Sequence, residues 1–141
     1  NDIAAAMGIH QLRKLPRFLD RRQYLAKRYF DALANLPLIL PADDTDGGSH
    51  SWHLFVIRLQ DDARMNRDEL IQFLSDKGIG ASVHYVPLHR QPYWRDRYQL
   101  TNDMFPETDK AYLSMASIPL YTAMSDEQQN RVIQALHEAL A

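Results

Sequence analysis

The sequence of 141 residues contains no cysteine, and this absence excludes several classes of site at once. Disulfide frameworks, thiolate catalysis and cysteine-based zinc sites all require that side chain. Disulfides are rare in the reducing cytosol, so the composition agrees with a cytoplasmic protein. We therefore expect a cytoplasmic chain that works without a thiol.

Charge of one sign and long apolar runs are also lacking. The net charge is −2, which gives no electrostatic reason to expect nucleic acid as a partner. No run reaches the ~18 apolar residues that span a bilayer, so we expect no membrane partner. The five glycines are too few and too scattered for a Walker-type phosphate loop or a dinucleotide fingerprint. No Ser-His-Asp ordering is recognisable either.

The residues that are present are those of an ordinary globular domain. Hydrophobic residues make up 45% and charged residues 24% of the chain. Its length suffices for one compact core. Helical periodicity dominates residues 2–15 and 17–36, with Pro16 at a kink or in the first turn of a second helix. We assign residues 1–36 to a helical arm and residues 37–141 to a small C-terminal domain.

Strand patterns follow a polar loop expected at residues 42–49. Runs rich in β-branched and aromatic residues predict strands at 51–60, 79–85 and 117–121. Pro119 indicates that the third of these lies at the edge of the sheet, because proline cannot donate a ladder hydrogen bond.

Helices are expected between and after these strands. Asn66 and Glu69 resemble a capping box, and Gly78 marks the end of the helix that they begin. This helix and the strands around it suggest a split βαβ-type unit.

Further helices are expected at "PYWRDRY", from Pro106 onward, and behind a second capping box at Ser125 and Gln128. The predicted fold is α+β: a small, three-stranded, mainly antiparallel sheet with helices packed on one face, preceded by the long helical arm.

Six histidines are the first candidates for chemistry: His10, His50, His53, His84, His89 and His137. His50 and His53 lie near Asp43, Asp44 and Asp46, but no recognised ligand spacing joins them. We therefore predict no metal site.

The stretch "ASVHYVPLH" at residues 81–89 is different, because it follows the end of an expected strand, where sites are commonly built. His84 and Tyr85 offer an imidazole and a phenol that can bond phosphate or hydroxyl oxygens. In the alternative interpretation, Tyr85 packs in the core and His84 bonds a backbone carbonyl.

None of the four lysines has the surroundings of a Schiff-base lysine, which needs a desolvated or cation-rich pocket. They lie on charged faces or at the ends of expected helices: Lys14, Lys27, Lys77 and Lys110. The residues alone thus predict binding of an anionic or hydroxylated ligand without a convincing nucleophile.

Four separated stretches resemble, in order, the C-terminal part of the sugar-nucleotide aminotransferases of the DegT/DnrJ/StrS type. They are "NDIAAAMGIHQLRKLPRFLDRRQYLAKRYFDAL", "HSWHLFVIRL", "RDELIQFLSDKGIGASVHYVPLHRQPYW" and "SIPLYTAMSDEQQNRVIQAL". The resemblance implies the small domain of a fold type I enzyme. Such an enzyme uses pyridoxal phosphate (PLP) to move an amino group, usually from glutamate, onto a nucleotide-linked keto sugar, and it works as a homodimer.

The resemblance also implies roles for individual residues. His84 and Tyr85 match the pair that lies over the sugar-nucleotide pocket, and His89 matches the next histidine, so all three are expected to bind substrate. The Schiff-base lysine, an "NYR" element and most PLP contacts are expected before Asn1, in a large domain. The chain alone is therefore expected to be inactive.

Two alternatives stay open at this point. Some members of the family are PLP-dependent sugar dehydratases that carry histidine in place of the lysine. The chain could also be a non-catalytic module for ligand binding or dimerisation. The sugar, the nucleotide, the aminated carbon and the pathway are not determined by these residues.

Overall fold

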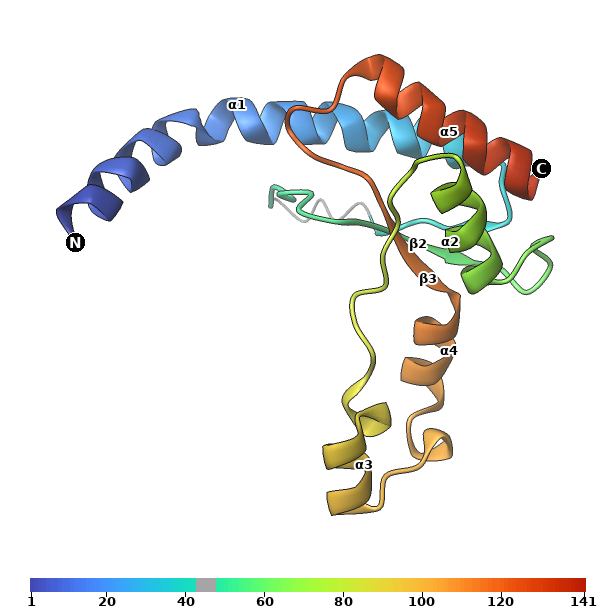
Figure 1. Cartoon of the computed structure of the whole chain (residues 1–141). Helices are drawn as coiled ribbons and strands as arrows, with labels where there is room; N and C mark the ends of the chain where they lie inside the picture. The colour runs from blue at the N-terminus through green and yellow to red at the C-terminus, as the bar shows by residue number, and fades with distance from the viewer. Residues whose placement is uncertain (43–47) are drawn as a thin grey trace.

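The computed structural model describes residues 1–42 and 48–141. Most of the polar loop expected at 42–49, including Asp43, Asp44 and Asp46, lies outside the described residues. Figure 1 shows the arrangement of the elements. In chain order they are α1 (Asp2–Leu33), β1 (Leu38–Ile39), β2 (Phe55–Leu59), α2 (Arg67–Asp76), η1 (Leu88–Arg90), α3 (Pro92–Tyr98), η2 (Asn102–Met104), α4 (Pro106–Ser114), β3 (Met115–Ile118) and α5 (Asp126–Leu140).

The three strands form one antiparallel sheet in the order β1-β2-β3. This confirms the predicted α+β class with a small antiparallel sheet. Phe55 and Ile57 of β2 are fully buried. They project from one face of the strand because successive side chains alternate.

Two details of the predicted sheet are wrong. The strand expected at 79–85 is absent, because only Ser82 pairs with Ser117 before the chain leaves the sheet. The described residues consequently contain no βαβ-type unit. The second error is that β1, the first strand of the sheet, was not predicted. A strand of two residues is too short to show a period-two pattern.

The helix α1 is continuous through Pro16, where two helices were one of the alternatives. Its first half is exposed and bends away from the body of the molecule, and the proline lies in this part (Figure 1). Its second half packs on the sheet and α5 through four buried residues: Leu25, Ala26, Tyr29 and Leu33. The boundary between residues 36 and 37 stays a prediction, although the core includes residues from both sides of it.

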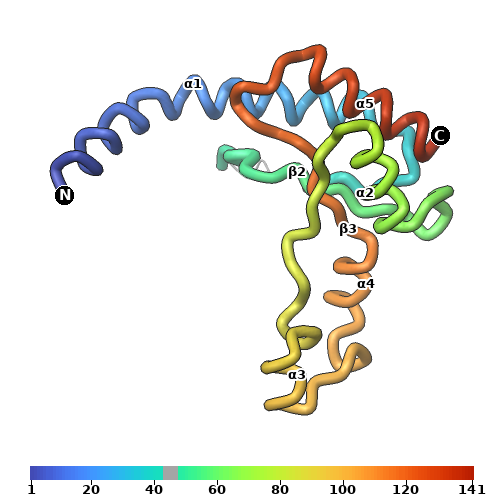
Figure 2. The backbone as a smooth tube through the Cα atoms, viewed as in Figure 1, coloured from blue at the N-terminus to red at the C-terminus, as the bar shows by residue number. Residues whose placement is uncertain are grey.

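Local signals placed the other helices correctly. The capping boxes Asn66/Glu69 and Ser125/Gln128 are both present. Gly78 has a φ of 70°, in the left-handed region that glycine adopts at little cost. The second capping box begins α5, which runs beside the second half of α1 (Figures 1 and 2).

Polar contacts fix α5 on α1. Asp126 accepts hydrogen bonds from Arg21 and Tyr24, each at 2.8 Å. The hydrogen bond from Arg21 is the main cause that lowers the pKa of the Asp126 carboxyl. Gln129 is fully buried and donates to the Leu25 carbonyl at 2.7 Å. These bonds fix the position of α5 relative to α1.

Residues 83–114 form a projecting segment that leaves the sheet after Ser82 and returns to it at β3 (Figure 2). The segment contains α3 and α4 and lies away from α1 and α5 (Figure 1). Across the described residues, no helix combines the length and apolar character that a membrane crossing requires.

Candidate functional site

His84 and Tyr85 lie near the start of the projecting segment. His84 is half-buried, and its Nδ1 lies 2.9 Å from Oγ of Ser117. Tyr85 is 75% exposed and meets the His84 ring edge-on, with ring centroids 5.0 Å apart. The imidazole therefore bonds a hydroxyl rather than a backbone carbonyl, and the tyrosine does not pack in the core. Both rings are available at the surface beside the sheet.

Ser117 is the residue of this site that sequence reasoning missed. It lies 33 positions from His84 and belongs to β3. The stretch "SIPLY" indicated a strand, but no spacing related its serine to the histidine. The bridge between Ser82 and Ser117 brings the two segments together.

His89, the third predicted binding residue, is buried inside the projecting segment. Its side chain is only 4% exposed and stacks on Phe105, with ring centroids 4.9 Å apart. Its Nε2 lies 3.1 Å from Oδ1 of Asp109. Direct contact between His89 and a substrate stays a prediction, and these contacts favour a supporting role.

Asp109 of α4 joins the outgoing and the returning part of the projecting segment, because it bonds residues of η1. It accepts two hydrogen bonds from the Arg90 guanidinium, both at 2.6 Å. The hydrogen bonds from Arg90 first, and that from His89 second, hold the pKa of the Asp109 carboxyl at about 2. Such a paired carboxylate is more stable in the folded chain than in the unfolded one.

Asp109 should therefore make stability depend on pH. Its pKa is lowered in the folded state, so its contribution is complete above the ordinary carboxyl pKa of about 3.9 and is lost as the pH falls towards 2. Asp109→Asn should lower the urea midpoint at pH 7 and should flatten its decline between pH 4 and about 2. The measurement is urea unfolding at several pH values.

The exposed Asp61 supplies a control for this prediction, because it is 93% exposed and lies 3.9 Å from Lys110. Asp61→Asn should keep the pH profile of the unmodified chain. An unchanged profile in Asp109→Asn would contradict the assignment of the acid-sensitive group.

A small apolar cavity of about 420 Å³ lies within the projecting segment. Its walls come from η1, α3 and the segment 100–108, and they include His89, Trp94 and Phe105. The imidazole of His89 thus borders a cavity although very little of it is exposed.

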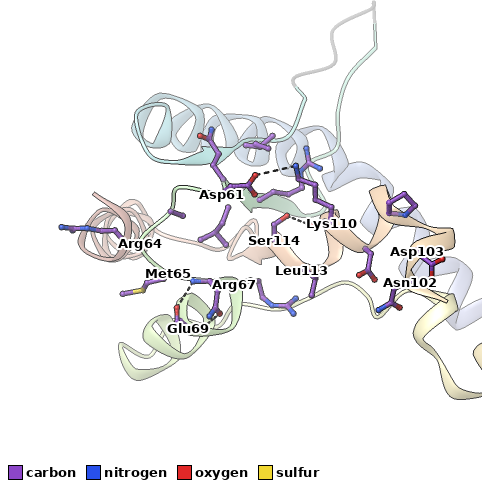
Figure 3. Close-up of a pocket in the computed structure, with 18 residues that line it drawn as sticks. Asp61, Arg64, Met65, Arg67, Glu69, Asn102, Asp103, Lys110, Leu113 and Ser114 are labelled. Atoms are coloured by element: carbon purple, nitrogen blue, oxygen red, sulfur yellow. Dashed lines mark hydrogen bonds and ion pairs between the residues drawn. The ribbon is translucent and has the colours of Figure 1, made fainter.

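A larger hollow of about 910 Å³ lies between β2, the start of α2 and α4 (Figure 3). Several of its charged groups already have partners in the protein. Lys110 lies 3.9 Å from Asp61, Glu69 caps α2, and Arg67 donates to the Tyr112 carbonyl at 3.1 Å. Neither His84 nor Tyr85 lines this hollow. The hollow was not foreseen, because its lining comes from segments far apart in the sequence.

The residues present do not fit PLP as an imine partner. All four lysines are exposed on the surface: Lys14, Lys27, Lys77 and Lys110. Three of them pair with carboxylates: Lys27 with Asp31, Lys77 with Glu138 and Lys110 with Asp61. Exposure and pairing both stabilise the charged ammonium, whereas an imine needs the neutral amine. Within residues 1–42 and 48–141, no three His, Asp or Glu side chains are grouped as metal ligands.

Comparisons with known proteins give one consistent result. The sequence is 36% identical to the spore coat polysaccharide biosynthesis protein SpsC of Bacillus subtilis over 139 residues, which is 97% of this chain and 36% of SpsC. The structure resembles the aminotransferase TlmJ of Streptoalloteichus hindustanus, with 28% identity and a TM-score of 0.86, over 99% of this chain and 36% of TlmJ.

A second solved structure agrees. The sugar aminotransferase candidate Spr1654 of Streptococcus pneumoniae, which is also known in PMP and PLP forms, has 27% identity and a TM-score of 0.90, over 99% of this chain and 35% of that protein. The chain therefore spans about a third of the length of the relatives that it matches.

The family assignment rests on nearly the whole chain. The sequence pattern of one family matches residues 1–137, which include all four stretches on which the resemblance was based. The chain belongs to the DegT/DnrJ/EryC1/StrS aminotransferase family.

Proposed function

We propose that this chain is the small, substrate-covering domain of a longer PLP-dependent aminotransferase that moves an amino group from glutamate to a nucleotide-linked keto sugar. The family match and the share of its relatives that the chain spans support this proposal. The PLP and PMP forms of Spr1654 support the cofactor. We further propose that the full-length protein is a cytoplasmic homodimer whose remaining part supplies the lysine and most PLP contacts.

The observation that carries the proposal is the pair His84 and Tyr85. His84 is fixed to the sheet through Ser117, while the phenol of Tyr85 is exposed beside it. A ring nitrogen and a phenolic hydroxyl can both bond the diphosphate or hydroxyl oxygens of a nucleotide sugar. We assign both residues substrate contacts. His89 would contact substrate through the apolar cavity that it lines, or would support the segment that carries His84 and Tyr85.

The chain's own residues bind and orient substrate in this proposal. PLP, when bound in the full-length enzyme, supplies the electron sink for moving the amino group. A rigid imidazole beside the sheet restricts where a bound sugar can lie, and positioning of this kind is a large part of enzymatic rate acceleration.

The test uses the full-length enzyme with PLP, glutamate and a 4-keto nucleotide sugar. Formation of 2-oxoglutarate that depends on the sugar is expected, and its absence would refute the aminotransferase assignment. The 141-residue chain alone serves as the control and should form none, because all four of its lysines are exposed and three of them are paired with carboxylates. Histidine at the position of the expected lysine would instead favour the dehydratase alternative.

A further inference from the structure

We propose that Ser117 is a positioning residue that holds the neutral His84 ring in the tautomer with its proton on Nε2. In this form the ring presents an N–H donor to an oxygen of the bound nucleotide sugar. The inference rests on the function proposed above and assigns a role to a residue that no sequence pattern indicated.

The position of Ser117 is fixed from two sides. Its backbone exchanges two hydrogen bonds with Ser82, from Ser82 N to Ser117 O at 3.1 Å and from Ser117 N to Ser82 O at 2.7 Å. On its other side it is paired with Val56 of the central strand β2. The residue is only 7% exposed. The backbone that carries its hydroxyl is therefore held in place beside the ring of His84.

The hydroxyl also determines which ring nitrogen carries the proton. Among the residues that the structure describes, the only hydrogen-bond partner of Ser117 Oγ is His84 Nδ1, at 2.9 Å. If Nδ1 carried the proton, the ring would donate and the serine proton would have no acceptor in the protein. A buried donor without an acceptor is costly. The serine therefore donates to Nδ1, and the ring proton lies on Nε2.

The opposite side of the ring, with Nε2, is left available for a ligand oxygen in this arrangement. No protein partner is found for His84 Nε2 within the described part of the chain, and the side chain is half-buried. Phosphate and sugar oxygens are acceptors, so an Nε2–H donor suits them, whereas an unprotonated Nε2 facing a phosphate oxygen would be repelled. A fixed donor also loses less conformational freedom on binding than a mobile one.

The first experiment needs no ligand. In the full-length enzyme labelled with ¹⁵N-histidine, the spectrum of His84→Ala identifies the His84 signals. The neutral ring is expected to show a protonated Nε2 and an unprotonated Nδ1, and Ser117→Ala is expected to shift both signals towards averaged values. A protonated Nδ1 in the unmodified enzyme would overturn the proposal.

The second experiment measures Kd for UDP-linked and dTDP-linked hexoses by calorimetry. Ser117→Ala should weaken binding by about two- to tenfold, as expected for one lost hydrogen bond. Ser117→Thr keeps the hydroxyl and should restore most of the affinity. Ser82→Ala, on the other side of the same bridge, leaves the backbone pairing in place and should have no effect.

A double-mutant cycle separates positioning from simple structural support. Because Ser117 acts through His84, Ser117→Ala should have no further effect on Kd in the His84→Ala enzyme. An equal effect in both backgrounds would overturn the proposal. If the unmodified enzyme bound neither hexose and formed no 2-oxoglutarate, the proposed function would fail, and the ¹⁵N spectra would still decide the role of Ser117.

Discussion

Replacing Phe55 with alanine is expected to destabilise the chain by about 3–5 kcal/mol, the range for deleting a buried aromatic side chain. Phe55 is fully buried in the central strand β2. Its ring centroid lies 5.0 Å from that of Tyr29 and 5.2 Å from that of Phe30, both on α1. The substitution would remove the contact between sheet and arm as well as the apolar area of the ring. Urea unfolding followed by circular dichroism measures the loss.

An exposed aromatic residue provides the matched control. Tyr98 is 58% exposed in α3, and Tyr98→Ala should change the free energy of unfolding by less than about 0.5 kcal/mol. If Phe55→Ala were equally mild, the second half of α1 would not share a core with the sheet.

The second large effect concerns His84. In the full-length enzyme, His84→Ala is expected to weaken nucleotide-sugar binding by about 10- to 100-fold, the range for losing a hydrogen bond to a charged group. The PLP absorbance should stay unchanged, because His84 bonds Ser117 and most PLP contacts are proposed to come from the remaining part of the enzyme. Calorimetry measures Kd, and the absorption spectrum of the loaded enzyme measures the cofactor.

His53 supplies the control for this prediction. It is exposed and lies outside the projecting segment, so His53→Ala should leave both signals intact. Parallel loss of sugar binding and PLP absorbance in His84→Ala would show that the residue supports the fold rather than the ligand.

The helices were predictable because their signals are local. A capping box joins residues three positions apart, as at Asn66 and Glu69, and the same pattern begins α5. The strand at 79–85 was wrong because an apolar, β-branched run gives no information about its partner. Ile79 is buried, yet the chain leaves the sheet after one bridge at Ser82.

The candidate site was likewise predicted only in part. Its histidine and tyrosine were found from one contiguous stretch and from the resemblance, and the family itself is confirmed. Their surroundings were not found. The sequence does not show that His89 is buried against Asp109, 20 positions away. The 910 Å³ hollow likewise combines segments from Ile39 to Ser114.

The sequence by itself determined the α+β class, the helices with their caps, the family and the stretch that carries His84 and Tyr85. The tertiary structure alone decided which strands pair, that Ser117 meets His84, and that Tyr85 is exposed while His89 is covered. The physical reason is the range of the interactions. Periodicity and capping act within a few residues, whereas a contact across 33 positions depends on how the whole chain packs.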